Sequence, residues 1–127
     1  MKKKVLLVED DDTLSLALKL RLDAMGYSPL IAKNVSSAMS MVVSRKPDIS
    51  LIDVNLPDGS GFSLAKQIQN SPNTPNIPLI FISACSLVEY KEQATFYSSA
   101  PLLEKPFETS QLIKYLEFTH NTSCNKH

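Results

Sequence analysis

Short apolar runs alternate along the chain with longer segments in which apolar residues recur every three or four positions. The short runs predict strands buried on both faces, and the longer segments predict amphipathic helices. The predicted strands are Val5–Val8, Tyr27–Ala32, Ile49–Asp53, Leu79–Ser83 and Leu102–Glu104. Strands that alternate with helices form a parallel sheet with right-handed connections. The pattern therefore predicts an α/β domain with a doubly wound parallel sheet of five strands and five helices.

Polar residues and glycines mark the ends of the predicted helices. Asp11 or Asp12 can cap the start of the first helix, and Gly26 ends it. Asn34 is placed to cap the second helix in the same way. The five helices are expected over residues 13–25, 35–43, 61–68, 87–97 and 108–118. The fourth is poorly amphipathic and rich in Ser, Glu and Lys, so we expect it to be the least stable element.

Two details of the pattern bear on how the elements pack. Pro29 has no backbone N–H to donate, which favours an edge position for the second strand. Leu16 and Leu20 form a second apolar stripe on the first helix, beside the stripe that should face the core. This second stripe indicates either crowded helix packing or a docking surface, and packing is the interpretation that we favour.

Composition narrows the class of protein. The 127 residues amount to about one domain, so we expect no second catalytic or DNA-binding domain. The formal net charge is zero, so the chain lacks the excess of positive charge that is typical of nucleic-acid-binding proteins. Cys85 and Cys124 show no paired spacing, as is typical of free thiols in a reducing compartment. With neither a signal peptide nor a membrane-spanning run, we expect a cytoplasmic protein that contacts neither membrane nor nucleic acid directly.

The polar segment at the end of the sequence carries a loose set of metal-binding residue types. His120, Cys124 and His127 could suggest a zinc site, but a fourth nearby ligand is lacking. We therefore do not predict zinc binding. We expect the domain to cover residues 1–120, with residues 121–127 as a polar C-terminal tail or the start of a linker.

Polar side chains stand at the carboxyl ends of four predicted strands: Glu9 with Asp10, Asp53, Ser83 and Lys105. Asp53 alone could serve only to open a turn, but ligands in parallel sheets bind where the carboxyl ends meet. Two carboxylates 5 Å apart repel by about 3 kcal/mol at an effective dielectric constant near 20. Three acids therefore need more positive charge than one lysine supplies. Oxygen ligands with room for water favour Mg²⁺ over zinc.

A metal ion beside a lysine is also an arrangement that binds phosphoryl groups, because the two cations together neutralise phosphoryl oxygens. One oxygen of Asp53 can bind the metal while the other attacks phosphorus and forms an acyl phosphate. The hydroxyl of Ser83 can then donate to a phosphoryl oxygen. A carboxylate nucleophile has no proton to lose, so it needs no general base.

Four motifs, in this order, closely resemble the receiver domain of two-component response regulators. They are Val-Glu-Asp-Asp at 8–11, Leu-Ile-Asp-Val-Asn-Leu-Pro-Asp-Gly-Ser-Gly at 51–61, Phe-Ile-Ser-Ala at 81–84 and Glu-Lys-Pro-Phe at 104–107. The resemblance covers about residues 3–118. It implies a flavodoxin-like fold in which the five strands have the order 2-1-3-4-5.

The resemblance implies a role for each residue of the acidic group. Asp53 matches the phosphoacceptor of the family and also a metal ligand. Asp10 matches the acid that binds Mg²⁺ directly, and Glu9 the acid that binds it through water. Asn55 matches the position whose backbone carbonyl completes the metal shell.

The remaining family positions are those of the conformational switch. Ser83 matches the switch hydroxyl, where Thr is commoner, and Lys105 matches the phosphate partner, with a cis bond to Pro106. Two positions depart from the family pattern: Leu102 stands where Tyr or Phe is usual, and Ser98-Ser99 stands where Gly-Ala is usual. We therefore hypothesise that output depends on repositioning of the helix at 87–97 without an aromatic flip.

The implied function is that of a signalling switch, which catalyses only its own aspartyl phosphorylation and dephosphorylation. The phosphoryl donor would be a sensor histidine kinase or a histidine phosphotransfer protein. The switched surface would comprise the fourth helix, the fifth strand and the fifth helix, and a downstream effector domain or protein would bind it. A phosphorylation-dependent homodimer is one assembly that the resemblance allows.

There are three alternatives to a phosphorylated receiver domain. Two are other classes of protein, and the third is a receiver that is not phosphorylated. A magnesium-dependent phosphatase with an aspartyl intermediate carries Asp-x-Asp at the end of its first strand, whereas Asp53 is on a middle strand and is followed by Val54-Asn55. A flavin carrier needs Ser, Thr or Gly donors after the first strand, where residues 9–12 are acidic. A degenerate receiver would bind partners without phosphorylation, although all the site positions carry usable chemistry.

Overall fold

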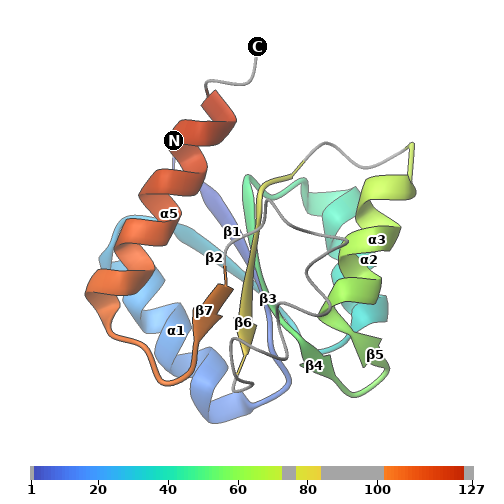
Figure 1. Cartoon of the computed structure of the whole chain (residues 1–127), viewed down its shortest axis with the longest axis horizontal. Helices are drawn as coiled ribbons and strands as arrows, with labels where there is room; N and C mark the ends of the chain where they lie inside the picture. Colours follow the sequence, from blue (N-terminus) through green and yellow to red (C-terminus); the bar gives the residue numbers. More distant parts are fainter. Residues whose placement is uncertain (1, 73–76, 84–101, 125–127) are drawn as a thin grey trace.

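A five-stranded parallel sheet forms the centre of the molecule (Figure 1). The computed structural model describes residues 2–72, 77–83 and 102–124, with side chains up to residue 117 in the last range. The strands of the sheet are β1 (Lys4–Val8), β2 (Ser28–Ala32), β3 (Ile49–Asp53), β6 (Leu79–Ser83) and β7 (Leu102–Glu104). Their spatial order is β2-β1-β3-β6-β7. This order confirms the predicted topology and places β2, with Pro29, at an edge.

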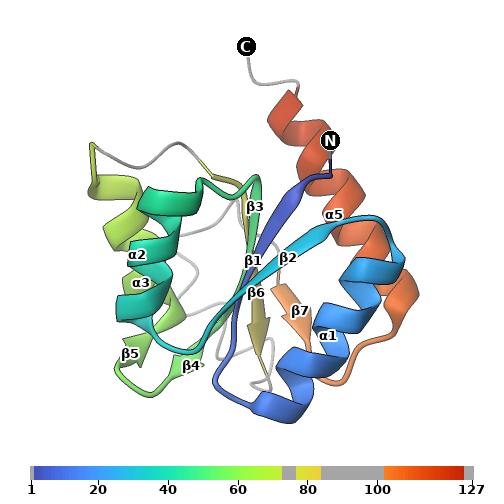
Figure 2. The ribbon, with the colours of Figure 1, turned by 180° about the vertical axis from the view of Figure 1, so that it is seen from behind.

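Helices cover both faces of the sheet (Figures 1 and 2). The helices are α1 (Asp12–Ala24), α2 (Val35–Arg45), α3 (Gly61–Asn70) and α5 (Thr109–Cys124). Helices α1 and α5 lie on one face, and α2 and α3 lie on the other. The helix predicted over 87–97 falls outside the described residues. Helix α5 ends at Cys124 rather than near Phe118, because a helix that has formed gains a backbone hydrogen bond with each residue added.

Capping explains where α1 and α2 begin. The Asp11 carboxylate accepts hydrogen bonds from the backbone N–H of Thr13, at 2.9 Å, and of Leu14, at 3.2 Å. The Asn34 side chain accepts one from the Ser37 N–H at 2.8 Å. Each cap satisfies N–H groups that have no partner inside the helix, so the predicted starting points of both helices are confirmed.

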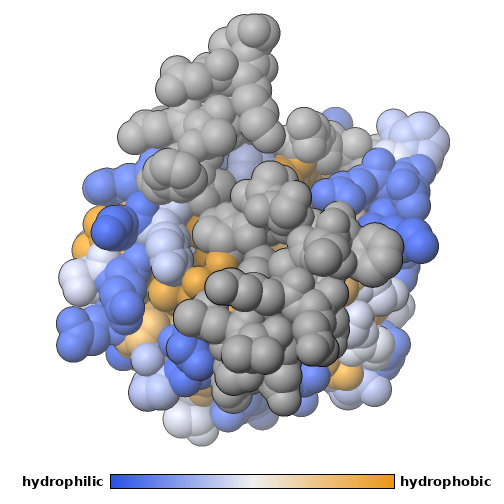
Figure 3. All heavy atoms as spheres, in the orientation of Figure 1, coloured by the Kyte–Doolittle hydropathy of each residue, from blue (hydrophilic) through white to orange (hydrophobic). Residues whose placement is uncertain are grey.

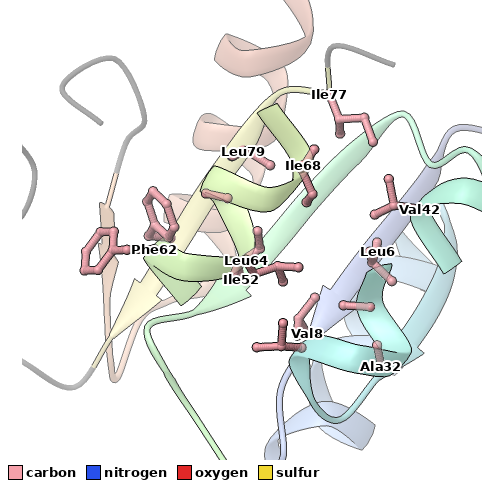
Figure 4. Packing of buried hydrophobic residues seen from close by; sticks show 14 of the residues in the cluster. Leu6, Val8, Ala32, Val42, Ile52, Phe62, Leu64, Ile68, Ile77 and Leu79 are labelled. Atoms are coloured by element: carbon pink, nitrogen blue, oxygen red, sulfur yellow. The ribbon is translucent and has the colours of Figure 1, made fainter. Parts of the chain in front are cut away.

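The core consists of two apolar layers, one on each side of the sheet, because successive strand residues point to opposite faces. The layer under α2 and α3 is shown in Figure 4 and includes Leu6, Val8, Ile52, Phe62, Leu64, Ile68 and Phe81. The layer under α1 and α5 includes Val5, Leu7, Leu18, Leu22, Leu51, Ile80, Leu112 and Leu116. The central strands are thus held rigidly up to their carboxyl ends.

Some apolar residues of the helices face solvent. Leu16 and Leu20 are 56% and 60% exposed, so the crowded-packing interpretation of this stripe is wrong. The sheet contacts only one stripe of α1, and Leu16 and Leu20 lie outside it. Val43 of α2 is also 45% exposed. On the face seen in Figure 3, the described surface is largely hydrophilic, with hydrophobic atoms visible beside α5. No helix among the described residues is long and apolar enough to cross a bilayer.

Ser50, in the middle of β3, is fully buried. Among the residues that the structure describes, its hydroxyl is the one buried side-chain group without a hydrogen-bond partner. Because an unsatisfied buried polar group is destabilising, Ser50→Ala is expected to raise the free energy of unfolding by about 1 kcal/mol. The control is Ser15→Ala, since the buried Ser15 hydroxyl donates to the Asp12 carbonyl at 3.2 Å. Urea denaturation that shows Ser50→Ala to be less stable than wild type would contradict this prediction.

Candidate functional site

Strand β3 delivers Asp53 to the carboxyl edge of the sheet. The strand pairs with β1 on one side and with β6 on the other, and all five of its residues are buried. Pairing continues one residue further, since the Val54 N–H donates to the Ile82 carbonyl at 3.0 Å. Asp53 itself is only 5% exposed. The backbone on both sides of this carboxylate is therefore fixed by the sheet.

Strand β1 delivers the acidic pair to the same edge. The Glu9 N–H donates to the Ala32 carbonyl at 3.0 Å, which extends the pairing of β1 with β2 by one residue. The Glu9 side chain is buried, whereas Asp10 is exposed. One carboxylate of the pair is thus buried at this edge of the sheet, and the other faces solvent.

Lys105, which follows β7, joins the two buried carboxylates. Its Nζ lies 2.6 Å from Glu9 Oε1 and 3.1 Å from Asp53 Oδ2. The Lys105 N–H donates to the Ser83 carbonyl at 2.8 Å, so the end of β6 positions the backbone from which the lysine extends. The bond between Lys105 and Pro106 is cis, as predicted. Residues 9, 53 and 105, far apart in the sequence, therefore meet in one ion-paired group.

Carboxylate oxygens of Glu9, Asp10 and Asp53 all lie within 4.8 Å of one another. In an octahedral Mg²⁺ site, ligand oxygens lie at about 2.1 Å from the metal, hence about 3.0 to 4.2 Å from one another. A small contraction would bring the three groups to those separations. Three carboxyl groups beside a single ammonium can carry more negative than positive charge. The donor set, all oxygen and partly open to solvent, therefore fits a hard divalent cation.

Burial and the neighbouring charges shift the pKa of Glu9 and of Lys105. Burial, followed by the interaction with Asp53, raises the pKa of the Glu9 carboxyl to about 7. Burial alone would lower the pKa of Lys105, but its hydrogen bond to Glu9 and the charge of Asp53 together raise it. Lys105 therefore remains a cation at neutral pH, while Glu9 holds or releases its proton near neutrality.

The raised pKa of Glu9 predicts that stability in the absence of metal depends on pH. Between pH 4.5 and about 7 the folded chain keeps a proton that the unfolded chain releases, so stability falls as pH rises through this range. The expected loss is up to about 3 kcal/mol. Urea denaturation with a chelator present should show this slope in wild type, and Glu9→Gln should lack it. Parallel curves for the two proteins would contradict the prediction.

The other two predicted site residues lie at the same edge. Ser83 is the last residue of β6, is 1% exposed and pairs with Glu104 of β7. Asn55 lies two residues after Asp53, the last residue of β3, and its N–H donates to Asp53 Oδ1 at 3.0 Å. The structure thus gathers all six predicted residues at one edge of the sheet, while their individual roles stay predictions.

A small hairpin after β3 was not predicted. Strands β4 (Asn55–Leu56) and β5 (Gly59–Ser60) pair antiparallel, with Asn55 opposite Ser60. Two-residue strands show no apolar alternation, so the only local signal is Asp58-Gly59, a pair typical of turns. The hairpin places Asn55 in a defined backbone conformation beside the phosphoacceptor candidate.

Sequence reasoning missed the importance of two residues near this hairpin. The Gly61 N–H donates to the Val54 carbonyl at 2.8 Å, and a Cβ at Gly61 would lie 2.4 Å from the Asp53 carbonyl oxygen. The Asp58 carboxylate accepts hydrogen bonds from the N–H groups of Val35 and Ser36. The local sequence marks Asp58 only as a turn residue and reveals no contact with a helix 23 residues away.

Comparison with protein families identifies the kind of domain that carries this site. The model of the response regulator receiver domain matches residues 5–117. The chain belongs to this family. As a receiver domain of two-component response regulators, it is a module of phosphorylation-based signalling. Membership decides against the phosphatase and the flavin carrier, and the matched range agrees closely with the predicted residues 3–118.

Curated relatives are transcriptional regulators. The phosphate regulon transcriptional regulatory protein PhoB of Pseudomonas aeruginosa is 31% identical over 115 residues, which is 91% of this chain and 50% of the relative. The transcriptional regulatory protein YxdJ of Bacillus subtilis is 31% identical over 104 residues, or 82% of this chain and 44% of the relative. The receiver domain thus spans about half the length of these relatives.

Solved structures share its fold. The non-phosphorylated HemR receiver domain from Leptospira biflexa superposes with a TM-score of 0.81 at 31% identity, covering 94% of each chain. A CheY-like receiver domain protein from Methanospirillum hungatei gives a TM-score of 0.89 at 19% identity, covering both chains completely, and shows the fold alone. The predicted flavodoxin-like fold is therefore confirmed.

Proposed function

We propose that this receiver domain accepts a phosphoryl group on Asp53 from a sensor histidine kinase or a histidine phosphotransfer protein, in a reaction that depends on Mg²⁺. The observation that carries the proposal is the group formed by Lys105 with Glu9 and Asp53, at 2.6 and 3.1 Å. A buried carboxylate beside a lysine and two further acids has the parts that phosphoryl transfer to an aspartate requires.

The proposed metal ligands are the Asp10 and Asp53 carboxylates and the Asn55 backbone carbonyl, with Glu9 binding through water. The chemistry that a bound Mg²⁺ supplies is neutralisation of the charge on the phosphoryl oxygens. A divalent cation nearby favours the ionised form of Glu9 even when water lies between them, so Glu9 is expected to release its proton when the metal binds. We therefore expect Mg²⁺ affinity to rise as pH increases through about 7.

In the proposed reaction, an Asp53 oxygen attacks phosphorus while the bond from phosphorus to the donor nitrogen breaks and its electron pair leaves with the nitrogen. Hydrogen bonds hold both Asp53 oxygens in place, since Oδ1 accepts from the Asn55 N–H and Oδ2 accepts from Lys105 Nζ. Lys105 is then placed to pair with the new phosphoryl group. The Ser83 hydroxyl is proposed to donate to the same group.

Incubation with Mg²⁺ and acetyl phosphate tests this function. We expect mass spectrometry to show one added phosphoryl group per chain, labile to hydroxylamine as an acyl phosphate is, and none when the metal is chelated. Mg²⁺ alone should stabilise the fold by about 2.7 kcal/mol at a hundredfold excess over its dissociation constant. A chain that takes up no phosphoryl group from acetyl phosphate would instead be a degenerate receiver.

We further propose that phosphorylation alters a surface that includes β7 and α5. A hollow of about 430 Å³ lies there, lined by residues that include Leu102, Lys105, Gln111 and Tyr115. Because Lys105 belongs both to this hollow and to the acidic site, its movement would connect the two. The helix predicted at 87–97 lies outside the described residues, so its part in the switch stays a prediction.

The proposed recipient of the signal is an effector domain or protein, because the curated relatives are named as transcriptional regulators and match over only half their length. A phosphorylation-dependent homodimer and a cytoplasmic location are part of the same proposal. Size-exclusion chromatography with and without beryllofluoride tests the dimer, and an unchanged elution volume would exclude it.

A further inference from the structure

The β4–β5 hairpin is attached to the rest of the domain at both of its ends. At its base, the Gly61 N–H donates to the Val54 carbonyl at 2.8 Å. At its tip, Asp58 Oδ1 accepts from the Val35 N–H at 2.7 Å, and Oδ2 accepts from the Ser36 N–H at 3.1 Å. Figure 2 shows the hairpin beside the start of α2, at the same edge of the molecule. One side chain thus links the segment after Asp53 to the neighbouring helix.

This link is not needed simply to start α2. The helix already has a local cap, because the Asn34 side chain accepts from the Ser37 N–H at 2.8 Å. Asp58 instead binds the two N–H groups that Asn34 leaves available, at the positive end of the helix. These hydrogen bonds lower the pKa of the Asp58 carboxyl, so it is ionised at neutral pH. The helix therefore offers a strong, fixed anchor for the hairpin tip.

The hairpin in turn determines where the Asn55 backbone lies. Asn55 is opposite Ser60 and Leu56 is opposite Gly59, so the hairpin contains only two residue pairs. Even a longer isolated hairpin is marginally stable in water, and one this short needs support from outside. The support comes from the base and from Asp58. Without the anchor at the tip, the hairpin would still be attached at its base, where the Gly61 N–H donates to the Val54 carbonyl, but its tip would lose the two hydrogen bonds to α2.

We propose that Asp58 is a positioning residue for the phosphorylation site, which anchors the hairpin to α2 and thereby holds the Asn55 backbone carbonyl where the metal binds. The proposal rests on the proposed function, because it assigns Asn55 to the metal shell. It predicts that loss of the anchor weakens Mg²⁺ binding. The described hydrogen bonds of the Asp58 side chain go to α2 and not to Glu9, Asp10 or Asp53.

The matched control is Asn34→Ala, which removes the other cap of α2 and leaves the hairpin contact intact. A purely structural cap would make Asp58→Ala and Asn34→Ala equivalent, with lower melting temperatures and unchanged metal affinity. A positioning role predicts instead that Asp58→Ala binds Mg²⁺ more weakly than Asn34→Ala does. Asp58→Asn is the conservative variant, since its amide oxygen can still accept one of the two hydrogen bonds.

The experiment is calorimetric titration with Mg²⁺, at a temperature where all variants are folded. We expect Asp58→Ala to bind about tenfold more weakly than wild type, as is typical when a partner behind the metal ligands is lost. Asp58→Asn should recover much of the affinity, and Asn34→Ala should match wild type. Hydrogen exchange of the Asn55 amide, measured without metal, should be faster in Asp58→Ala only.

Different results overturn different proposals. If wild type binds Mg²⁺ and Asp58→Ala binds it equally well with unchanged Asn55 exchange, the positioning role is wrong and the proposed function stands. If wild type binds no Mg²⁺, the proposed function fails. The exchange of the Asn55 amide in metal-free protein then still decides whether Asp58 holds the hairpin.

Discussion

Asp53→Asn is expected to abolish phosphoryl uptake from acetyl phosphate while the domain stays folded. The amide that replaces the carboxylate has nearly the same shape but is not a nucleophile for phosphorus. Asp53 is 5% exposed and its Oδ2 lies 3.1 Å from Lys105 Nζ, so we expect phosphoryl transfer to depend on this carboxylate. We expect one phosphoryl group per chain in wild type and none in the variant, measured by mass spectrometry of the intact protein.

The same substitution should not destabilise the metal-free protein. Asp53 contributes to the raised pKa of Glu9, which reflects the cost of placing two carboxylates close together inside the fold. Lys105 keeps Glu9 as a partner at 2.6 Å when Asp53 becomes neutral. A free energy of unfolding at or above that of wild type is therefore expected without Mg²⁺, and Mg²⁺ should stabilise the variant much less.

Asp11→Asn is the control for this prediction. It makes the same chemical change two residues from Glu9, at an exposed carboxylate that caps α1. Asn is as good an N-cap as Asp, so the variant should fold normally and take up one phosphoryl group. Uptake by Asp53→Asn, or loss of uptake in Asp11→Asn, would show that the phosphoacceptor is a different residue.

Gly61→Ala is expected to have the largest effect on stability. An added Cβ would lie 2.4 Å from the Asp53 carbonyl oxygen and 2.8 Å from Ile52 Cγ2, well inside van der Waals contact. Relief requires movement of the backbone of β3 or of the first turn of α3, and both are packed in the core. We expect a loss of about 3 kcal/mol or more, which lowers the melting temperature by roughly 10 °C. Because the clash displaces Asp53, any folded variant should also take up phosphate poorly.

Gly26→Ala separates this clash from the general cost of replacing a glycine. Gly26 has a φ of +89° and no atom within 4 Å of an added Cβ, so alanine there suffers backbone strain alone. The expected cost is about 1 to 2 kcal/mol, with normal phosphoryl uptake. If thermal denaturation shows the two variants to be equally stable, and both take up a phosphoryl group, then the close packing of Gly61 on Asp53 is needed neither for stability nor for phosphorylation.

Much of the fold could be predicted from local pattern. The bounds of β3, β6 and β7 agree with the prediction, because each is a buried apolar run that ends at a polar residue. The hairpin β4–β5 was missed because its pairs of residues are too short to show a period. The interpretation of Leu16 and Leu20 as part of a crowded helix packing was wrong for another reason. An apolar stripe on a helix does not reveal how much of it the sheet will cover.

The sequence by itself determined the alternation of strands and helices, the polar residues at the strand ends and the resemblance to receiver domains, since these depend on residue types and short spacings. Tertiary structure alone decided that Lys105 joins Glu9 to Asp53, that the pKa of Glu9 rises to about 7, and that Asp58 reaches α2. Each of these depends on distances and burial between residues far apart in the chain. Such quantities exist only once the sheet has formed, because it is the sheet that brings the strand ends together.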